Sequence, residues 1–320
     1  MTAKLAILFR PEGDSPLTAV GLLLTGVFIL AFQDSLVKLI SSHTSYWQFQ
    51  TLRSLGNMTI CIVLAVVSGH LMLLRPINSA AVYLRATFLS ITMFCFFSAA
   101  PFLSIAQMAA GLYTYPVFVT ILATPILGEK VGVWRAAAVL VGAIGAAIVL
   151  DPWEKDFSFI QVLPLAAGFF YACNILTLRH SCRQESPLAL AFAVAVVMAL
   201  SGLGGVTYLS LNPLSLETQL DLPFIAVGWP QLTLLVLGLA LAASVLNLAG
   251  NICMSRAYQT AEASLLAPLD FVYLVFIALW SRVLFDQWPT SQALLGMALI
   301  ASAGALTAWR EQVKRRERRS

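Results

Sequence analysis

The sequence predicts an all-α, polytopic membrane protein with ten transmembrane helices. Hydrophobic residues make up 59% of the chain and charged residues only 11%, whereas soluble domains carry roughly 25% charged residues. The apolar residues gather into runs close to the roughly 20 residues that a helix needs to cross a bilayer. Short connections separate these runs, so we expect no separate soluble domain.

Ten apolar runs along the chain define the predicted transmembrane helices. They cover residues 17–40, 47–69, 80–99, 103–127, 134–151, 158–179, 187–210, 231–254, 263–285 and 291–310. The longest connection, residues 211–230, contains Pro213, Pro223 and Pro230. The first run is long enough to span a membrane by itself, so we do not expect a cleaved signal peptide.

Basic residues predict the orientation of the chain. Most of the 19 lysines and arginines fall in connections that lie on one side of the membrane in this topology. Cytoplasmic connections carry an excess of such residues, so both termini are expected to be cytoplasmic. An even number of spans leads to the same orientation. The basic tail, residues 311–320, fits this topology signal better than it fits nucleic-acid binding.

The two halves of the chain carry a similar series of motifs. In each half a proline motif precedes a motif that ends in an acidic residue, and a Gly-Ala pair follows. These motifs are Tyr115–Pro116, Leu127–Glu129 and Gly145–Ala146 in the first half, and Ala267–Pro268, Leu284–Asp286 and Gly304–Ala305 in the second. The spacing differs by about five residues between the halves. We therefore predict two five-helix repeats, residues 1–151 and 152–310, which have inverted topology because five is odd.

Several of these segments resemble a known family. The segment Tyr115–Arg135 resembles the end of the first EamA repeat in the drug/metabolite transporter superfamily, and Asp34–Lys38 is similar to its opening helix. Arg53, Leu84–Arg85 and Ala267–Phe271 also fit this pattern, so the resemblance extends over nearly the whole chain. Two features depart from the family pattern: Asp286 stands where glutamate is usual, and Ser281–Arg282 stands where small or apolar residues are commoner.

The resemblance implies ten helices around a central cavity that moves small metabolites by alternating access. On family grounds we expect a bacterial inner-membrane protein that exports a small polar metabolite, such as an amino acid or a derivative. The alternative within the family is uptake of a nucleoside-like or vitamin compound. An alternative of another class is a membrane sensor or assembly subunit that transports nothing.

Asp270 is the most unusual residue within the predicted spans. It lies about eight residues into the run 263–285, where a carboxylate costs about 2.5 kcal/mol or more on insertion scales. Pro268 is expected to break this helix, as is Pro116 in the first half. Arg282 is twelve residues away, or about 18 Å along a helix, and cannot pair with Asp270. Asp270 therefore needs a partner on another helix, a substrate cation or a proton that it carries during transport; alternatively, it only hydrogen-bonds a broken helix in place.

Four charged residues are predicted near the periplasmic end of the spans. Asp34 and Lys38 are four residues apart on one helix and so share a face, and Arg53 and Arg282 fall at a similar depth. Together they predict a periplasmic gate or charge network. The alternative is a structural ion pair with lysine and arginine side chains that extend to the interface.

Polar and aromatic residues on several spans predict the lining of a central cavity. Amides and phenols could orient a small zwitterion, although such side chains also bridge transmembrane helices without a ligand. The predicted lining residues are Gln107, Tyr113, Tyr115, Tyr171, Asn174, Asn247, Asn251, Asp270 and Tyr273.

The sequence gives little support to an enzyme. It contains no nucleophile-elbow, phosphate-loop or metal-ligand spacing, and its five cysteines form no CxxC pair. We therefore expect no cofactor, no metal and no nucleic-acid partner, and transport that depends on an ion gradient, such as a proton gradient, or on the substrate's own gradient. Ala138, Gly142 and Ala146 form a small-residue face that favours close helix packing within the chain, or alternatively a homodimer.

Overall fold

The computed structural model describes residues 16–127, 133–150, 158–182, 184–260, 266 and 269–317, and every regular element in this part of the chain is helical. The long helices are α2 (Pro16–Ile40), α3 (Tyr46–Val67), α4 (Ser79–Ser98), α5 (Ile105–Leu112), α6 (Tyr115–Leu127), α7 (Val133–Leu150), α8 (Leu163–Ser181), α9 (Pro187–Leu211), α12 (Leu234–Thr260), α14 (Val272–Phe285) and α15 (Ser291–Glu317). Shorter elements are η1 (Leu71–Leu74), η2 (Phe159–Val162), α10 (Leu216–Asp221) and α11 (Pro223–Ala226).

Seven of the described helical segments are long and apolar enough to cross a membrane. They are Leu17–Ile40, Tyr46–Val67, Ser79–Ser98, Ile105–Leu122, Phe159–Leu178, Pro187–Leu211 and Leu234–Met254. Three apolar helices are shorter: Ala137–Val149, Val272–Phe285 and Ser291–Leu306. The all-α membrane architecture that the sequence predicts is therefore confirmed, while the count of ten spans stays a prediction.

Local sequence explains where several helices begin. The hydroxyl of Ser45 accepts a hydrogen bond from Gln48 N at the start of α3, and Ser186 does the same for Leu188 N at the start of α9. Ser104 and Gln107 form a reciprocal capping box at the start of α5. These side chains satisfy backbone N–H groups that a helix leaves free in its first turn.

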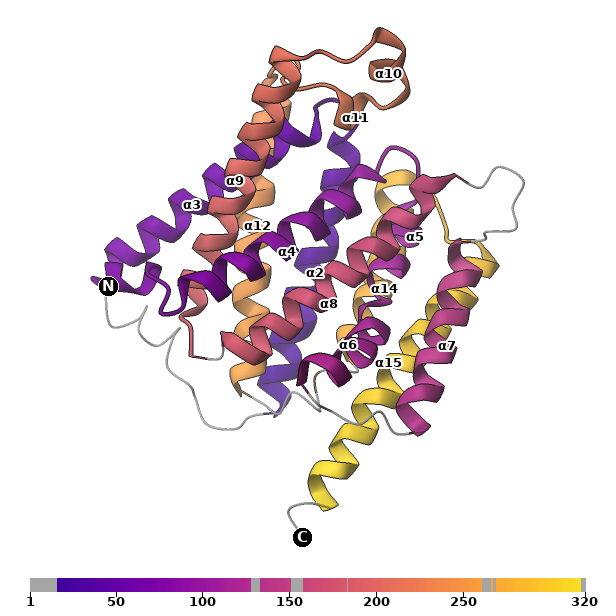
Figure 1. Cartoon of the computed structure of the whole chain (residues 1–320). Helices are drawn as coiled ribbons and strands as arrows, with labels where there is room; N and C mark the ends of the chain where they lie inside the picture. The colour runs from indigo at the N-terminus through magenta and orange to yellow at the C-terminus, as the bar shows by residue number, and fades with distance from the viewer. Residues whose placement is uncertain are drawn as a thin grey trace.

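The helices pack in a pattern of pairs that Figure 1 shows in space. Helix α2 lies against α12 and α14, while α8 lies against α4 and the α5–α6 segment. Helix α3 pairs with α9, and α7 pairs with α15. Two further contacts, α4 with α9 and α12 with α3, complete the set of larger contacts around α3 and α9. The first and second halves of the chain are therefore interleaved and do not form separate bundles.

Glycines allow two of these pairs to approach closely. A Cβ atom on Gly26 of α2 would lie 2.9 Å from the carbonyl oxygen of Gly250 in α12. A Cβ atom on Gly145 of α7 would lie 2.8 Å from the carbonyl oxygen of Gly296 in α15. Small residues permit this backbone contact, which drives helix association in lipid.

The small-residue face predicted on α7 packs within the chain. Ala138 and Ala146 are buried, and a Cβ atom on Gly142 would meet Val117 of α6 and Ala303 of α15. Leu140 and Ile144, on the other side of α7, are exposed. The small face is therefore occupied by other helices of the same chain, which agrees with the first of the two predicted uses.

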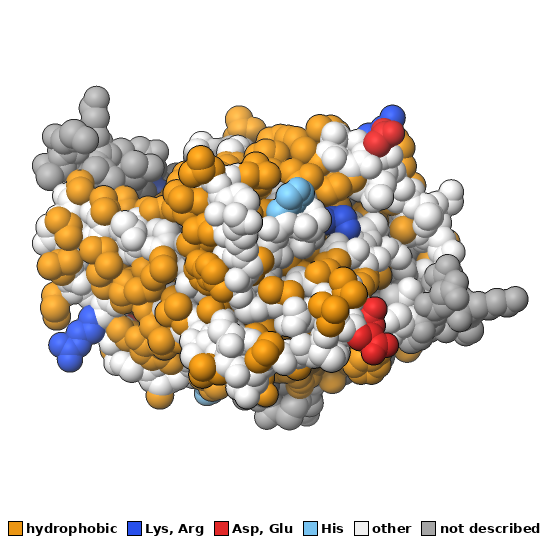
Figure 2. Space-filling view, turned by 90° about the horizontal axis from the view of Figure 1, so that it is seen from above, with side chains coloured by type: hydrophobic (Ala, Val, Ile, Leu, Met, Phe, Trp, Pro, Cys, Tyr) orange, Lys and Arg blue, Asp and Glu red, His pale blue; other side chains and the backbone are white. Residues whose placement is uncertain are grey.

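The segment that contains α10 and α11 covers one end of the helices. Ser45 donates a hydrogen bond to Gly228 O (2.7 Å), and Trp47 Nε1 donates one to Ile225 O (2.8 Å). Gln48 Nε2 donates to Pro230 O at 2.8 Å. We call this the α10 end of the molecule. Viewed from it, the surface is largely hydrophobic, with few charged side chains (Figure 2).

Candidate functional site

Helices α5 and α6 are separated by a break where the sequence predicts one. Helix α5 ends at Leu112 and α6 begins at Tyr115, directly before Pro116. Proline has no N–H to donate and clashes with the preceding turn, so a helix cannot continue regularly through it. The predicted span 103–127 is therefore two helices joined at Tyr113 and Thr114.

A second irregularity precedes α14. Asp270 lies directly before Phe271, which is the N-cap of α14. Pro268, the predicted cause of a break here, lies outside the described residues. The carboxylate of Asp270 is thus close to the N-terminus of a helix, where the partial positive charge of the backbone stabilises an anion.

The two irregular regions contact each other through Asp270. The hydroxyl of Tyr115 donates a hydrogen bond to Asp270 Oδ2 at 3.2 Å, and the hydroxyl of Tyr113 donates one to the Asp270 carbonyl oxygen at 3.3 Å. The second bond satisfies a backbone oxygen at the interruption between the helical residues 269–270 and α14, where the regular hydrogen-bond ladder is incomplete. Asp270 therefore has partners on another helix segment, one of the possibilities that the sequence leaves open.

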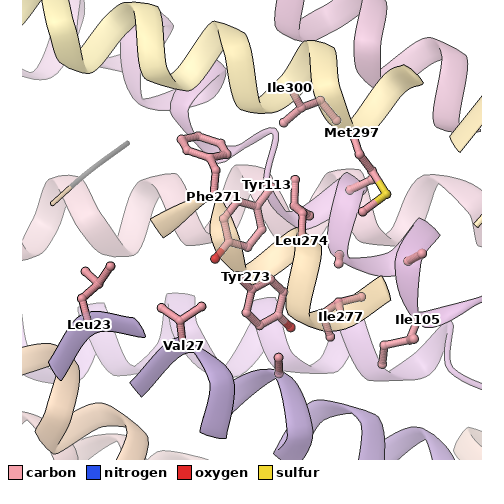
Figure 3. Close-up of a cluster of buried hydrophobic side chains, with 14 of the residues drawn as sticks. Leu23, Val27, Ile105, Tyr113, Phe271, Tyr273, Leu274, Ile277, Met297 and Ile300 are labelled. Carbon is pink, nitrogen blue, oxygen red and sulfur yellow. The ribbon is translucent and has the colours of Figure 1, made fainter. Parts of the chain in front are cut away.

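Asp34 in α2 is linked to the same region by Tyr273 of α14. The Tyr273 hydroxyl donates a hydrogen bond to Asp34 Oδ2 at 2.6 Å. Its ring stacks on that of Tyr113, with the centroids 5.0 Å apart and the planes at 13° (Figure 3). Tyr113 and Tyr273 are 7% and 4% exposed. We call Asp34, Tyr113, Tyr115, Asp270 and Tyr273 the tyrosine–carboxylate cluster.

Tyr171 extends the cluster onto α8, and Asn174 lies three residues further along that helix. The Tyr171 ring meets the Tyr115 ring edge-on, with centroids 5.0 Å apart, and lies within electrostatic range of Asp270 and of Arg85 in α4. Asn174 is 3% exposed, and its Oδ1 accepts no hydrogen bond from the described residues. A buried acceptor without a donor is costly, so Oδ1 is available to a water molecule or a ligand.

Arg53 of α3 is a buried cation close to the cluster. It is 2% exposed, and its guanidinium lies over the rings of Phe49 and Phe97 at 5.4 and 5.5 Å. Arg53 Nη2 donates a hydrogen bond to Gln50 Oε1 at 2.9 Å. Asp34 lies within electrostatic range of it. Arg53 and Asp34 therefore balance each other's charge without direct contact.

The other two predicted gate charges lie elsewhere. Lys38 Nζ donates hydrogen bonds to the carbonyl oxygens of Ala100, at 2.8 Å, and Leu103. Arg282 is 45% exposed and pairs with Asp286 four residues along the chain. The four predicted charges are thus distributed over three places, because the long side chains of Lys38 and Arg282 reach polar partners near the helix ends.

Lys38 also lines a cavity of about 400 Å³ at the end of α2. We call this cavity the Lys38 pocket. Its walls come from α2, the residues around the start of α5 and the connection between α14 and α15. They include Lys38, Phe102, Gln107, Ser281, Trp288 and Thr290. Gln107, predicted to line a central cavity, therefore lines this pocket.

Asn247 and Asn251 of α12 make structural contacts. Asn247 Nδ2 donates a hydrogen bond to Gln33 Oε1 of α2 at 3.1 Å, and Asn251 Nδ2 donates one to the carbonyl oxygen of Asn247 at 2.7 Å. The first bond joins two helices, which is the ligand-free role that such residues often have. Sequence reasoning missed Gln33 and the interior position of Arg85, although both are polar residues in apolar runs.

Comparison with known proteins gives matches to membrane transporters. Residues 17–151 match the EamA-like transporter family. A riboflavin transporter of Vibrio cholerae is 32% identical over 213 residues, which cover 66% of this chain and 65% of that protein. An S-adenosylmethionine uptake transporter of Rickettsia prowazekii is 28% identical over 60% of this chain and 58% of its own length. The pseudopaline exporter CntI of Pseudomonas aeruginosa is 24% identical over 65% of this chain and 68% of its own length.

These relatives are matched over part of their length. The chain spans just under two thirds of the riboflavin transporter. A solved crystal structure is similar over 90% of this chain and 96% of its own, with a TM-score of 0.56 and 18% identity. At that identity the similarity shows a shared fold only.

Proposed function

We propose that this chain, whose residues 17–151 belong to the EamA-like transporter family, is a secondary transporter of a small polar metabolite. In this proposal ten helices span the bacterial inner membrane, both termini are cytoplasmic, and the substrate passes by alternating access. The family assignment supports a transporter over an enzyme.

The observation that carries the proposal is the tyrosine–carboxylate cluster. Asp34 and Asp270 come from distant parts of the sequence and meet through tyrosines in the interior of the helices. A carboxylate inside hydrocarbon costs about 2.5–3.5 kcal/mol on insertion scales, and such residues commonly mark substrate or ion pathways.

The pattern of helix pairs supports an inverted repeat. When the ten predicted spans are numbered, the contact of the first with the eighth (α2 with α12) corresponds to that of the sixth with the third (α8 with α4). The contact of the first with the ninth (α2 with α14) corresponds to that of the sixth with the fourth (α8 with α5 and α6). In this comparison the first span is equivalent to the sixth, the third to the eighth and the fourth to the ninth. Replacing each span by its equivalent converts one contact of each pair into the other. In such transporters the substrate site lies near the midplane between the repeats.

The chemistry of the cluster favours a ligand that donates hydrogen bonds. Carboxylates accept hydrogen bonds and attract cations, so an amine or ring N–H group could replace the Tyr115 hydroxyl at Asp270. Phenol rings provide flat apolar surfaces beside these acceptors. An amino acid or a derivative fits this set, and Asp270 or Asp34 would carry a proton when the substrate leaves. Export is the direction that we propose.

A second candidate is uptake of a heterocyclic vitamin. It is favoured by the similarity to riboflavin transporters and by the stacked rings of Tyr113 and Tyr273, which a planar ligand could separate. Growth of a riboflavin-auxotrophic strain without its own uptake system tests this candidate. Rescue of growth at low riboflavin by this chain would support uptake, and equal growth with an empty vector would exclude riboflavin as the substrate.

The proposed export is tested by an untargeted metabolite comparison between cells that overexpress the protein and cells that lack it. Export predicts that one or a few compounds increase in the medium and decrease inside the overexpressing cells. Unchanged pools on both sides would contradict export and favour a protein that transports nothing, such as a sensor or an assembly subunit.

A further inference from the structure

The Lys38 pocket differs in charge from the tyrosine–carboxylate cluster. Among the described residues that line the pocket, Lys38 carries the only formal charge and no carboxylate is present. The volume of about 400 Å³ falls within the range of roughly 300–1,000 Å³ that is usual for small-molecule sites. The pocket is thus large enough for a metabolite and has a positive charge in its wall.

The ammonium group of Lys38 retains capacity for a ligand. It has three N–H donors, of which two are directed at the carbonyl oxygens of Ala100 and Leu103. These bonds also fix the position of the ammonium, so a ligand would not have to order a free lysine side chain. The ammonium also lies 5.7 Å from the centroid of the Phe285 ring, which is a weaker contact than a charged hydrogen bond, so the third donor can bind an anionic oxygen.

Gln107 provides a second donor in the pocket wall. Its Oε1 accepts hydrogen bonds from the backbone N–H and the hydroxyl of Ser104, at 3.0 and 2.8 Å. This arrangement orients the amide, and Nε2 donates to no partner among the described residues. The capping box therefore fixes the Gln107 amide and leaves its Nε2 group free to donate a hydrogen bond to a ligand in the same cavity.

Trp288 supplies an apolar surface in the wall of the same pocket. It follows the end of α14, is 65% exposed and lines the pocket together with Phe102. An exposed indole without a protein partner on its face can stack on a flat ligand. Cation, amide donor and indole together form a site for a molecule that combines an acidic group with a planar apolar one.

We infer that the Lys38 pocket is a second ligand site, which binds small aromatic carboxylates at the α10 end of the molecule. If the proposed function holds, this site receives the acidic group of a substrate whose donor groups bind in the tyrosine–carboxylate cluster. The substrate would then be an amphoteric compound, with an acid and a hydrogen-bond donor. The inference about binding itself does not depend on transport.

Protection of a cysteine in the pocket wall tests this inference. Gln287→Cys places a thiol on an exposed lining residue, and Leu216→Cys places one on α10, away from the pocket, as the matched control. The purified full-length protein is labelled with a neutral maleimide in the presence of indole-3-acetate or of its uncharged analogue indole-3-acetamide. The parent protein gives the background from its five cysteines.

Indole-3-acetate should slow labelling of Gln287→Cys and leave Leu216→Cys unchanged. Its half-protecting concentration should be about fivefold lower than that of indole-3-acetamide, which corresponds to about 1 kcal/mol for the charged contact. Adding Lys38→Gln should remove this difference, and adding Trp288→Ala should weaken protection by both compounds. Size-exclusion elution confirms that each variant is folded.

Three results would overturn the inference: no protection by indole-3-acetate, equal protection by both compounds, or equal protection at Leu216→Cys. Because Trp288→Ala leaves the hydrogen bonds of Lys38 intact, it remains informative if Lys38→Gln fails to fold. Binding is measured without flux, so failure here leaves the proposed transport untouched. Conversely, a protein that binds the probe but transports nothing would contradict only the proposed function.

Discussion

In the tyrosine–carboxylate cluster the polar groups bind one another, whereas in the Lys38 pocket they face an open cavity. Both regions combine charge with aromatic rings, but the cluster is acidic and at least half-buried, and the pocket is basic and accessible. The difference indicates what each can do. Opening the cluster requires that tyrosine hydroxyls leave their carboxylates, while the pocket can accept a ligand without rearrangement.

The comparison also separates charges that look alike in the sequence. Arg53 is buried and has aromatic neighbours, while Arg282 is partly exposed and pairs locally with Asp286. A buried charge depends on its surroundings for stability, whereas an exposed pair contributes little. Substitutions of buried charges should therefore change stability and transport far more than the same substitutions of exposed charges.

The largest effect is expected for Asp34→Asn. It removes the negative charge that accepts the Tyr273 hydroxyl and lies within range of buried Arg53. Replacing a charged acceptor by a neutral one costs about 1.5 kcal/mol or more. Because the proposed transport depends on this contact, the same loss from the transporting conformation should lower flux through proteoliposomes at least about tenfold. The matched control is Asp286→Asn, which changes an exposed carboxylate and should retain nearly full flux. Equal losses in both variants would show that charge loss alone is responsible.

A smaller effect is expected for Tyr273→Phe. The ring can still stack on Tyr113, but Asp34 loses its donor, which should destabilise the folded protein by about 1–3 kcal/mol. Tyr46→Phe is the control, because the buried hydroxyl of Tyr46 has no hydrogen-bond partner among the described residues and its removal should be neutral. Thermal unfolding in detergent measures both. A Tyr46→Phe variant that is less stable than Tyr273→Phe would contradict the assigned hydrogen bonds.

The contact between α2 and α12 is tested by Gly26→Ala. The added methyl group would overlap the Gly250 carbonyl oxygen and Cys253 of α12, and such crowding usually costs about 1–3 kcal/mol. Gly21→Ala, on the same helix, has no atom within 4 Å of the new methyl group. It should leave stability unchanged or raise it by about 0.5–1 kcal/mol. The thermal midpoint of Gly26→Ala should therefore fall, while that of Gly21→Ala stays the same or rises. An equal shift in both variants would contradict the α2–α12 contact.

The smallest effect is expected for Arg282→Gln. Arg282 is 45% exposed and its partner Asp286 is 84% exposed, and exposed ion pairs contribute roughly 0–1 kcal/mol. Thermal stability and flux should both remain close to those of the unchanged protein. A loss of flux comparable with that of Asp34→Asn would contradict this assignment and indicate that Arg282 acts in one periplasmic gate with Asp34.

Local patterns in the sequence predict the membrane helices and the break before Pro116. They also predict that Asp270 cannot pair with Arg282 and that a partner on another helix is one solution. Both conclusions depend on distance along the chain, which the regular rise of a helix fixes. The residues of the tyrosine–carboxylate cluster were all predicted to be functional.

The arrangement of those residues could not be predicted in the same way. Asp34 and Tyr273 are 239 positions apart, and their contact depends on how α2 and α14 rotate and pack. The direction of the Lys38 side chain depends on the position of the carbonyl groups in the turn between α4 and α5, to which its ammonium donates hydrogen bonds. Depth in a membrane span follows from sequence position, but the direction of a side chain around the helix axis follows from tertiary contacts.

The central claim is that the tyrosine–carboxylate cluster is the translocation site. It is tested most directly by an untargeted metabolite comparison of cells that express the unchanged protein, Asp270→Asn or Asp286→Asn at equal membrane levels. We expect the same compounds to change in the medium with the unchanged protein and with Asp286→Asn, and no such change with Asp270→Asn. An equal change with Asp270→Asn, or no change with any of the three proteins, would contradict the claim.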